Sequence, residues 1–305
     1  ALDPDNPQLS KVGHDPDPGS VKVEHMFPMR SLDKATEDEE LTHFVHTTTM
    51  GAMRYVSQPK LDGSALSLEY RKGRLVRAAT RGNGERGEDV TANARRIPNI
   101  PESLGWDGDC HIRGEVVMPL ETFRSKYASF APNPRNLAAG SLRQKHVEAG
   151  KGDAADLSFH AYGVMFPGLD HKHPDSPAPP DFNHDSQAID WLTQNGIAAA
   201  GNEVVEAGVD EGIEEAEADE AVAEALLQVT ENWARKRDTA DWELDGVVIK
   251  LDEFRKRELL GKTAHHPRWA LAWKFPPEEA TTVLLGVDWR TGRTGTGTPV
   301  ARVAP

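Results

Sequence analysis

The sequence contains one cysteine, Cys110, among its 305 residues. An internal disulfide framework and a zinc site built on cysteines are therefore excluded. The sequence also lacks any apolar run near the roughly 20 residues that a membrane-spanning helix needs, and no signal-peptide pattern opens it. Hydrophobic residues make up 38% of the chain and charged residues 28%, so we expect a cytoplasmic protein with a real core and no membrane partner.

Positive charge is in short supply, because 35 lysines and arginines face 49 acidic residues and the net charge is −14. This balance is only a weak argument against a nucleic-acid partner, since phosphate contacts require no more than a local basic surface. Much of the acid lies at Glu37–Glu40 and in the run Glu203–Glu224. We interpret both runs as solvated helix faces.

The pattern along the chain predicts a mixed α+β fold, because strands arrive in groups rather than in strict alternation with helices. Residues 1–24 are rich in Asp, Pro and Gly and are predicted to form an extended lead-in. Strands are predicted near residues 55–70, 75–80, 111–118, 157–164, 246–251 and 269–275. Helices are predicted at 33–48, after Pro119, at 135–145, at 185–196 and along an acidic stretch that ends near Trp233.

The first motif that could carry chemistry is Lys60-Leu61-Asp62-Gly63, at the end of a predicted strand. Period-two geometry places Lys60 and Asp62 on one face. A lysine that attacks phosphorus must first lose a proton, which neighbouring cations or burial can favour. The alternative at this point is an ordinary surface Lys–Asp pair in a turn.

Two further segments combine glycines with charge. The loop 80–90 carries Arg81 and Arg86 among three glycines, which let a backbone approach a phosphate or sugar closely. Arg113-Gly114-Glu115 places two charged side chains on one strand face, where a carboxylate could hold ribose hydroxyls or a metal. A plain polar loop and a cross-strand ion pair are the respective alternatives.

A basic segment follows at Asn133-Pro134-Arg135-Asn136 and Gly140-Ser141-Leu142-Arg143. Arg135 and Arg143 are eight residues apart, a little over two turns of a helix, so both could face one phosphate track. A solvated basic helix face would have the same pattern.

Two motifs on the late predicted strands complete the candidate residues, Glu243–Lys250 and Arg268–Pro276. In the second strand, Ala270 and Ala272 share a face with Lys274 and leave room for a ligand, whereas the large apolar residues occupy the other face. Lys60, Lys250 and Lys274 together would form a cationic cluster. Such a cluster would help a lysine lose its proton and would stabilise a phosphate under attack.

Taken in order, these six motifs resemble the nucleotidyltransferase domain of NAD-dependent DNA ligases. The resemblance begins near Glu24, includes His25–Asp33, and continues to Pro305. It implies an ATP-grasp-like nucleotidyltransferase fold of antiparallel sheets flanked by helices, with the nucleotide cleft between them. We accordingly expect a lead-in at residues 1–24, an adenylation domain at 25–285, and the start of an oligonucleotide-binding domain at 286–305.

The resemblance also implies roles for individual residues. Lys60 would attack the α-phosphate of NAD and carry AMP, which then passes to the 5′-phosphate of a DNA nick for joining to the 3′-hydroxyl. Asp62 and Asp245 would support this lysine and bind a catalytic Mg²⁺. Glu115 would hold the ribose. The implied partners are NAD or AMP and nicked double-stranded DNA, and the implied state is a monomer.

Further roles follow from the same resemblance. Tyr162 would stack on adenine, with the stem of Lys250 on the other face of the base. Lys250 and Lys274 would contact the α-phosphate. The arginines that would contact phosphate or DNA are Arg81, Arg135, Arg143 and Arg237.

The sequence departs from the family pattern in three ways. Gln58 stands where the family usually has a glutamate near the adenine, so we expect altered nucleotide affinity. The family's N-terminal module, which grips the nicotinamide mononucleotide half of NAD, and its downstream zinc, helix-hairpin-helix and BRCT modules are not matched. Without the first we expect weak reaction with NAD, and without the others we expect nick sealing to fail or nearly so. Two other functions stay open, an ATP-dependent DNA or RNA ligase-type nucleotidyltransferase and a non-catalytic nucleotide- or DNA-binding module.

Overall fold

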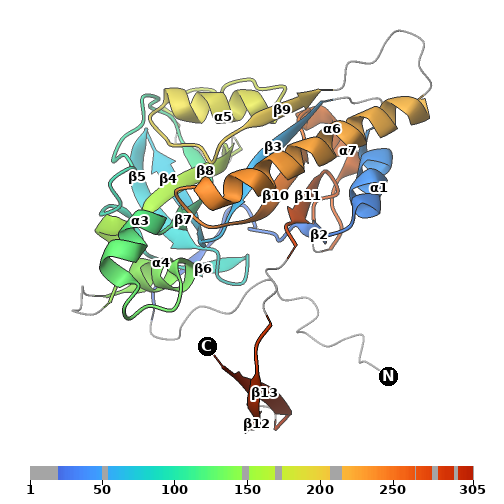
Figure 1. Ribbon diagram of the computed structural model, residues 1–305. Coiled ribbons are helices and arrows are strands. Elements are labelled where there is room, and N and C mark those ends of the chain that lie inside the picture. Colours follow the sequence, from blue (N-terminus) through green and yellow to red (C-terminus); the bar gives the residue numbers. More distant parts are fainter. Residues whose placement is uncertain are drawn as a thin grey trace. The chain divides into compact units, whose positions relative to one another are not determined.

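The computed structural model of the chain describes residues 20–49, 54–145, 151–168, 174–206, 215–264, 266–276, 281–291 and 295–304 (Figure 1). The chain divides into two units, Ala1–Phe275 and Pro276–Pro305. The larger unit is built on two main sheets whose strand pairs are antiparallel, apart from one parallel pair at an edge. The α+β prediction is confirmed.

The first main sheet has five strands in the order β2-β11-β10-β3-β9. Their bounds are β2 Asp33–Ala35, β11 Ala270–Lys274, β10 Leu244–Leu251, β3 Arg54–Leu61 and β9 Glu203–Glu206. Neighbouring strands are therefore far apart in sequence, and β3 lies beside β10 although almost two hundred residues separate them. This pairing brings the Lys60 motif next to the Asp245 motif.

The second main sheet has four strands in the order β5-β4-β7-β8. Their bounds are β5 Arg74–Thr80, β4 Ser64–Arg71, β7 Cys110–Val117 and β8 Ser158–Met165. The predicted hairpin turn between β4 and β5 is confirmed, with Lys72 and Gly73 both at positive φ. A small separate sheet pairs β1 (Lys22–Glu24) with β6 (Arg86–Glu88), so the N-terminal segment is tied to the loop after β5.

The helices lie around these sheets. They are α1 Asp38–Thr48, α2 Thr91–Ala94, α3 Leu120–Thr122 with a π-turn at Phe123–Tyr127, α4 Pro134–Arg143, α5 Asp185–Gln194, α6 Glu215–Lys236 and α7 Phe254–Leu260, and short 3-10 turns occur at Ala154–Asp156 and Arg237–Thr239. No helix in this described part of the chain has both the length and the apolarity that crossing a membrane requires.

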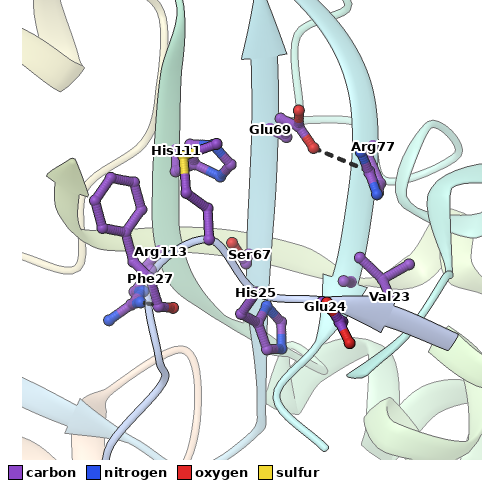
Figure 2. Close-up of a pocket in the computed structure, with 11 residues that line it drawn as sticks. Val23, Glu24, His25, Phe27, Ser67, Glu69, Arg77, His111 and Arg113 are labelled. Atoms are coloured by element: carbon purple, nitrogen blue, oxygen red, sulfur yellow. Dashed lines mark hydrogen bonds and ion pairs between the residues drawn. The ribbon is translucent and has the colours of Figure 1, made fainter. Parts of the chain in front are cut away.

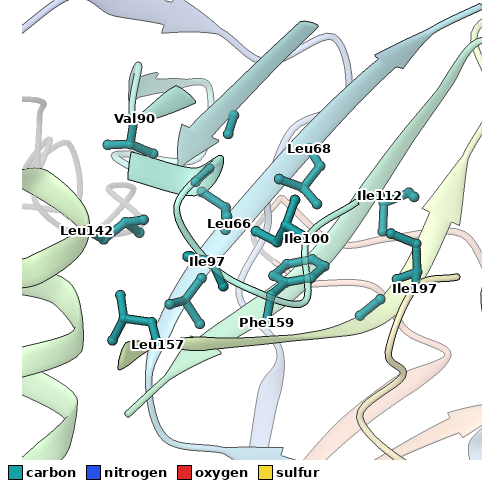
Figure 3. Packing of buried hydrophobic residues seen from close by; sticks show 14 of the residues in the cluster. Leu66, Leu68, Val90, Ile97, Ile100, Ile112, Leu142, Leu157, Phe159 and Ile197 are labelled. Atoms are coloured by element: carbon teal, nitrogen blue, oxygen red, sulfur yellow. The ribbon is translucent and has the colours of Figure 1, made fainter. Parts of the chain in front are cut away.

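Each main sheet has its own apolar core. Under the four-stranded sheet, Leu66, Leu68, Ile112 and Phe159 pack with residues of α2, α4 and α5 (Figure 3). Under the five-stranded sheet, alternate residues of β3, β10 and β11 pack against α1 and α6. The face of each sheet opposite its core carries the polar residues that the sequence predicts for the site, because side chains alternate along each strand.

Most predicted elements are confirmed, but one interpretation is wrong. The acidic run from Glu203 does not begin as a helix face, because Glu203–Glu206 forms edge strand β9 against β3. Val205 is buried in the core while Glu206 stays exposed, and this alternation is typical of a strand. Residues 207–214 lie outside the described residues, and α6 carries the rest of the acidic run.

In residues 281–291 and 295–304 of the smaller unit, β12 (Leu284–Thr291) pairs antiparallel with β13 (Gly297–Val303). Large apolar side chains on it are exposed, among them Trp289 at 72% and Leu284 at 59%. A two-stranded hairpin is marginally stable by itself in water.

Candidate active site

The ends of β3 and β11 bring two lysines, Lys60 and Lys274, to one carboxylate on β10. The Lys60 Nζ lies 3.0 Å from Oδ1 of Asp245, and the Lys274 ammonium forms an ion pair with the other oxygen of the same carboxylate. Burial alone would raise the pKa of Asp245, but the two ammonium groups outweigh it and the pKa is lowered. Burial lowers the pKa of Lys274, and the nearby charge of Lys60 adds to that shift.

A β-bulge directs Asp245 to this position. Leu244 pairs with Leu61 and Gly246 pairs with Lys60, so Asp245 is an extra residue in β10. Perfect alternation would place residue 245 on the face of Val247, which is the core face. The bulge instead buries Leu244 in the core and leaves the Asp245 side chain with the lysines.

Glycines allow the strands to close around the motif. A Cβ on Gly63 would lie 2.1 Å from the carbonyl oxygen of Val116 in β7, and one on Gly246 would lie 2.0 Å from the carbonyl oxygen of Trp273. Neither position can accept a side chain without moving backbone. The glycines of the Lys60–Gly63 and Asp245–Gly246 motifs are therefore required by the close packing of the strands, apart from any chemical role of the motifs.

Asp62 lies between β3 and β4 and pairs with helix α4. Its carboxylate lies 2.9 Å from Arg135, the second residue of that helix. Asn133 caps the helix by accepting a hydrogen bond from the backbone N–H of Asn136. Burial raises the pKa of Asp62 and Arg135 counteracts it only in part. Asp245 also contributes to this rise, so the two carboxylates lie close enough to repel each other.

Glu115 projects from β7 into the same neighbourhood. Burial raises the pKa of its carboxyl to about 8, although the positive charges of Lys60, Arg81 and Arg135 oppose the shift. Burial raises the pKa of the Tyr162 phenol on β8, and the nearby charge of Glu115 adds to this rise. At neutral pH, Glu115 is therefore mostly protonated and can donate a hydrogen bond.

Gln58 is a buried amide without a partner. It is 2% exposed, and neither its Nε2 nor its Oε1 makes a hydrogen bond to the rest of the described chain. It lies two residues before Lys60 on β3, so the two side chains share a face. A buried amide without hydrogen bonds lowers the stability of the fold. Gln58 could therefore bind a ligand that offers both a donor and an acceptor.

Lys250 does not join Lys60 and Lys274 in one contact cluster. It pairs across the sheet with Val56, four residues from Lys60, which is roughly 13 Å along the strand. Its ammonium lies 2.7 Å from Asp185 and donates to the carbonyl oxygen of Tyr162 over 3.0 Å. The predicted single cluster of three lysines is therefore wrong, because the length of β10 between Gly246 and Lys250 separates the charges.

The structure adds two residues that sequence reasoning did not select for the site, Asp185 and Arg257. Asp185 is the first residue of α5 and was interpreted only as part of a helix start. Arg257 in α7 lies 3.1 Å from it. A lone aspartate before an amphipathic helix has no pattern that predicts a buried lysine partner, so no signal in the sequence could have identified this pair.

The remaining predicted arginines have different positions. Arg81 follows β5 and lies close enough to Glu115 and Tyr162 to affect both titrations. Arg143 ends α4 and lies 3.5 Å from the buried carboxylate of Glu88. Arg237 begins the 3-10 turn after α6. Arg81 and Arg135 thus belong to the surroundings of Glu115, whereas Arg143 marks the far end of the same helix as Arg135.

The N-terminal segment lines a polar hollow on the four-stranded sheet (Figure 2). Arg113 donates to the backbone carbonyl oxygens of Phe27 and Pro28. The His25 ring lies within hydrogen-bond distance of the carbonyl oxygens of Thr80 and Arg81. Glu69 in the hollow forms an ion pair with Arg77. Arg113 and Glu115 occupy alternate, part-buried positions of β7, so they share a face as predicted. Phe27 and Pro28, which follow β1, cover the Arg113 part of that face.

Asp62 and Asp245 could supply part of the coordination shell of a magnesium ion, with other ligands completing it. Within the described residues, no group of three or more His, Cys, Asp or Glu side chains could hold a metal ion. Asp62 and Asp245 offer two neighbouring carboxylates. Mg²⁺ commonly binds one or two carboxylates and completes its shell with water and substrate phosphates, and this pair fits that pattern.

Comparison with known proteins gives a consistent match. Residues 19–278 match the family model described as the NAD-dependent DNA ligase adenylation domain. The chain is 39% identical over 311 residues to a DNA ligase of Alcanivorax borkumensis, covering 97% of this chain and 37% of that protein. It is 37% identical over 296 residues to a DNA ligase of Bacillus cytotoxicus, covering 93% and 40% respectively. The chain thus spans about two fifths of the length of these relatives.

Solved structures with some likeness include ligases of other classes. An archaeal ATP-dependent RNA ligase aligns with a TM-score of 0.44 and 13% identity, over 83% of this chain and 49% of that one. The ATP-dependent DNA ligase of bacteriophage T7 in complex with ATP aligns with a TM-score of 0.40 and 12% identity, over 89% and 80%.

Proposed function

The chain belongs to the family of NAD-dependent DNA ligase adenylation domains, and on that premise we propose that it transfers AMP from NAD to the side chain of Lys60. The observation that carries the proposal is the position of the Lys60 amine. It lies against Asp245 and beside Lys274, with Asp62 and Glu115 near enough to interact electrostatically. A nucleophilic amine, acceptors for its proton and a cation for a phosphate thereby lie together at the end of β3.

The proposed first step is an exchange at the α-phosphorus of NAD. The Lys60 nitrogen forms a bond to phosphorus, loses a proton, and the bond to nicotinamide mononucleotide breaks. Asp245 accepts a hydrogen bond from Lys60 and so orients the amine. The charge of Lys274 stabilises the phosphate oxygens as negative charge develops on them. The product is a lysine–AMP phosphoramidate and free nicotinamide mononucleotide.

Two further steps would seal DNA. The 5′-phosphate of a nick attacks the phosphorus of the lysine–AMP, the N–P bond breaks, and AMP becomes attached to that phosphate. The 3′-hydroxyl then attacks the 5′-phosphorus, loses a proton and releases AMP. Arg135, Arg143 and Arg237 are proposed to hold the DNA phosphates as charge-assisted hydrogen-bond donors. Nicked double-stranded DNA is thus the proposed partner of a monomeric, cytoplasmic enzyme.

The nucleotide is proposed to extend from Lys60 toward Lys250 along β10. Glu115 would bond the ribose hydroxyls, Arg81 would contact phosphate, and Tyr162 would stack on the adenine. The amide of Gln58 would bond the base edge, where it offers one donor and one acceptor. Over the roughly 13 Å between the Lys60 and Lys250 positions, the stem of Lys250 would lie against the base and its ammonium would reach back toward the α-phosphate.

Magnesium would be held by Asp62 and Asp245. When bound there, it would supply Lewis-acid neutralisation of phosphate charge. The two carboxylates contribute the negative charge that such an ion needs, and the Lys60 and Arg135 side chains now pair with them.

Incubation with radiolabelled cofactors tests the proposal. The chain is incubated with magnesium and NAD labelled in its adenylate half, or with ATP labelled at the α-phosphate, and protein-bound label is measured after denaturation. We expect label from NAD and none from ATP. Label from ATP would favour an ATP-dependent ligase-type enzyme, and no label from either, together with undiminished nucleotide or DNA binding, would favour a non-catalytic module.

A further inference from the structure

The Lys250 ammonium is held by groups from two different elements, α5 and β8. Asp185 in α5 lies 2.7 Å from its ammonium, and the Tyr162 carbonyl oxygen of β8 accepts a hydrogen bond at 3.0 Å. The lysine is 7% exposed. One ion pair and one hydrogen bond therefore fix the position of an ammonium group that has three N–H donors.

Asp185 itself is shared between two cations. Arg257 lies 3.1 Å from its other carboxylate oxygen, and that guanidinium also donates to the carbonyl oxygen of Leu251 and stacks 4.3 Å above the Trp269 ring. One negative charge therefore faces two positive charges in a buried setting. The trio has a net charge of +1, and an anionic group of a ligand would balance it.

The segment that carries Asp185 is fixed independently of the lysine. The backbone N–H of Asp185 donates to the carbonyl oxygen of Asp252, and the N–H and hydroxyl of Ser186 both donate to the buried Asp252 carboxylate. Asp252 in turn forms an ion pair with Arg54 over 2.6 Å. These hydrogen bonds fix the backbone at Asp185 without any contribution from Lys250.

We propose that Asp185 is a positioning residue that keeps the Lys250 ammonium charged and aimed at the anionic part of a nucleotide in the cleft. This inference rests on the proposed function, because it assigns a purpose to Lys250 within that site. Asp185 acts through Lys250 and does not touch the nucleotide.

The electrostatics of Lys250 agree with this role. Burial lowers the pKa of Lys250 and Asp185 opposes that effect, whereas Arg257 adds to the lowering and Asp252 works weakly against it. The pKa of Asp185 is lowered to about 2 because Lys250 and Arg257 outweigh its burial. Replacing Asp185 with a neutral residue would leave two buried cations facing each other, and Lys250 would lose its proton at a lower pH.

Four variants of the whole chain separate positioning from simple structural damage. Asp185→Asn removes the charge at nearly constant shape, and Asp185→Glu restores it. Arg257→Met removes the competing cation and should change the Lys250 titration in the opposite direction to Asp185→Asn. Ser186→Ala disturbs the same helix start without touching Lys250 and serves as the matched control.

The first measurement is AMP affinity by calorimetry between pH 7 and pH 9.5. We expect Asp185→Asn to weaken binding about tenfold or more at pH 7 and to lose further affinity as the pH rises, whereas wild type, Asp185→Glu and Ser186→Ala stay nearly level. Wild-type behaviour of Asp185→Asn over the whole range would overturn the proposal, as would the same pH dependence in Ser186→Ala.

The second measurement needs no ligand, so it tests the role of Asp185 even if wild type does not bind AMP. A wild type that does not bind AMP would count against the proposed function. The nitrogen-15 shift of the Lys250 side chain is followed against pH in the free protein. We expect the titration midpoint to fall in Asp185→Asn and to rise in Arg257→Met. Unchanged midpoints, or a fall in both variants, would contradict the role of Asp185.

Discussion

The Lys60 ammonium lies 3.0 Å from a carboxylate oxygen of Asp245, a residue 185 positions further along the chain. The β-bulge at Asp245 creates this contact, and the Lys274 ammonium shares the same carboxylate. Asp245 thus places one negative charge between the ammonium groups of Lys60 and Lys274. The predictions below follow from this arrangement and from the buried groups around it.

Replacing Asp245 with asparagine should leave Lys60 and Lys274 in mutual repulsion. We expect Asp245→Asn to lower the free energy of unfolding by about 1 kcal/mol, because all three side chains are partly exposed and solvent screens the charges. Added pyrophosphate should raise the melting temperature of the variant more than that of wild type, since the anion replaces the lost charge. Equal stabilisation of both proteins by pyrophosphate would show that the two lysines do not form an anion site.

The Glu115 carboxyl predicts a stability change at alkaline pH. Its pKa in the folded chain is about 8, above the ordinary 4.5, so the folded state holds this proton more tightly than the unfolded chain. The stability associated with Glu115 is full below pH 4.5 and is lost as the pH rises through 8. Denaturant unfolding should show Glu115→Gln close to wild type at pH 5 and more stable by a few kcal/mol at pH 9, because a pKa rise from 4.5 to about 8 corresponds to at most ~5 kcal/mol.

The exposed Glu121→Gln is the control for this comparison, because it removes one carboxylate from α3 without touching the cleft. It should match wild type at both pH values. If Glu115→Gln shows no gain over wild type at pH 9, the glutamate is not buried as described.

The unpartnered amide of Gln58 predicts opposite effects on stability and on binding. Gln58→Leu removes two unsatisfied polar atoms at similar volume and should raise the free energy of unfolding by about 1 kcal/mol. Calorimetry should find AMP binding weakened by about tenfold, because one bidentate contact to the base is worth ~1–3 kcal/mol. A less stable Gln58→Leu variant that binds AMP normally would remove Gln58 from the proposed base site.

The two arginines of α4 predict a salt-dependent effect on DNA binding. Arg135→Ala and Arg143→Ala should each weaken binding of nicked duplex DNA, and each should reduce the slope of log affinity against log salt by about one. Arg74→Ala, at the opposite end of β5 from Arg81, should leave the slope unchanged. Binding of nicked DNA is measured by fluorescence anisotropy at several salt concentrations, and equal slopes for all three variants would argue against α4 as a DNA contact.

The sequence predicts much of this molecule because its strands and helices have strong local patterns. The alternation of Leu66, Leu68 and Tyr70 identifies β4, and the small residues Ala270 and Ala272 identify the cleft face of β11. Both follow from burial on one side of a strand. The order of the motifs also indicates the family without knowledge of any contact.

The parts that the sequence does not predict depend on pairing between distant strands. The face of Asp245 is set by a bulge that appears only when β10 pairs with β3, so strict alternation assigns it to the core. The separation of Lys250 from Lys60 depends on register, and its contact with Asp185 depends on where α5 meets β8 and β10. The Glu203–Glu206 strand was interpreted as helix because its acidic residues outweigh the short alternation around Val205.

Mass spectrometry of the lysine adduct tests the central claim most directly. The chain and its Lys60→Ala variant are incubated with NAD and magnesium, and intact masses are recorded before peptides are mapped. We predict a gain of one AMP in wild type, located on the peptide that contains Lys60, with release of nicotinamide mononucleotide and no gain in the variant. AMP attached to another residue, or an equal gain in Lys60→Ala, would contradict the assignment of Lys60 as the nucleophile.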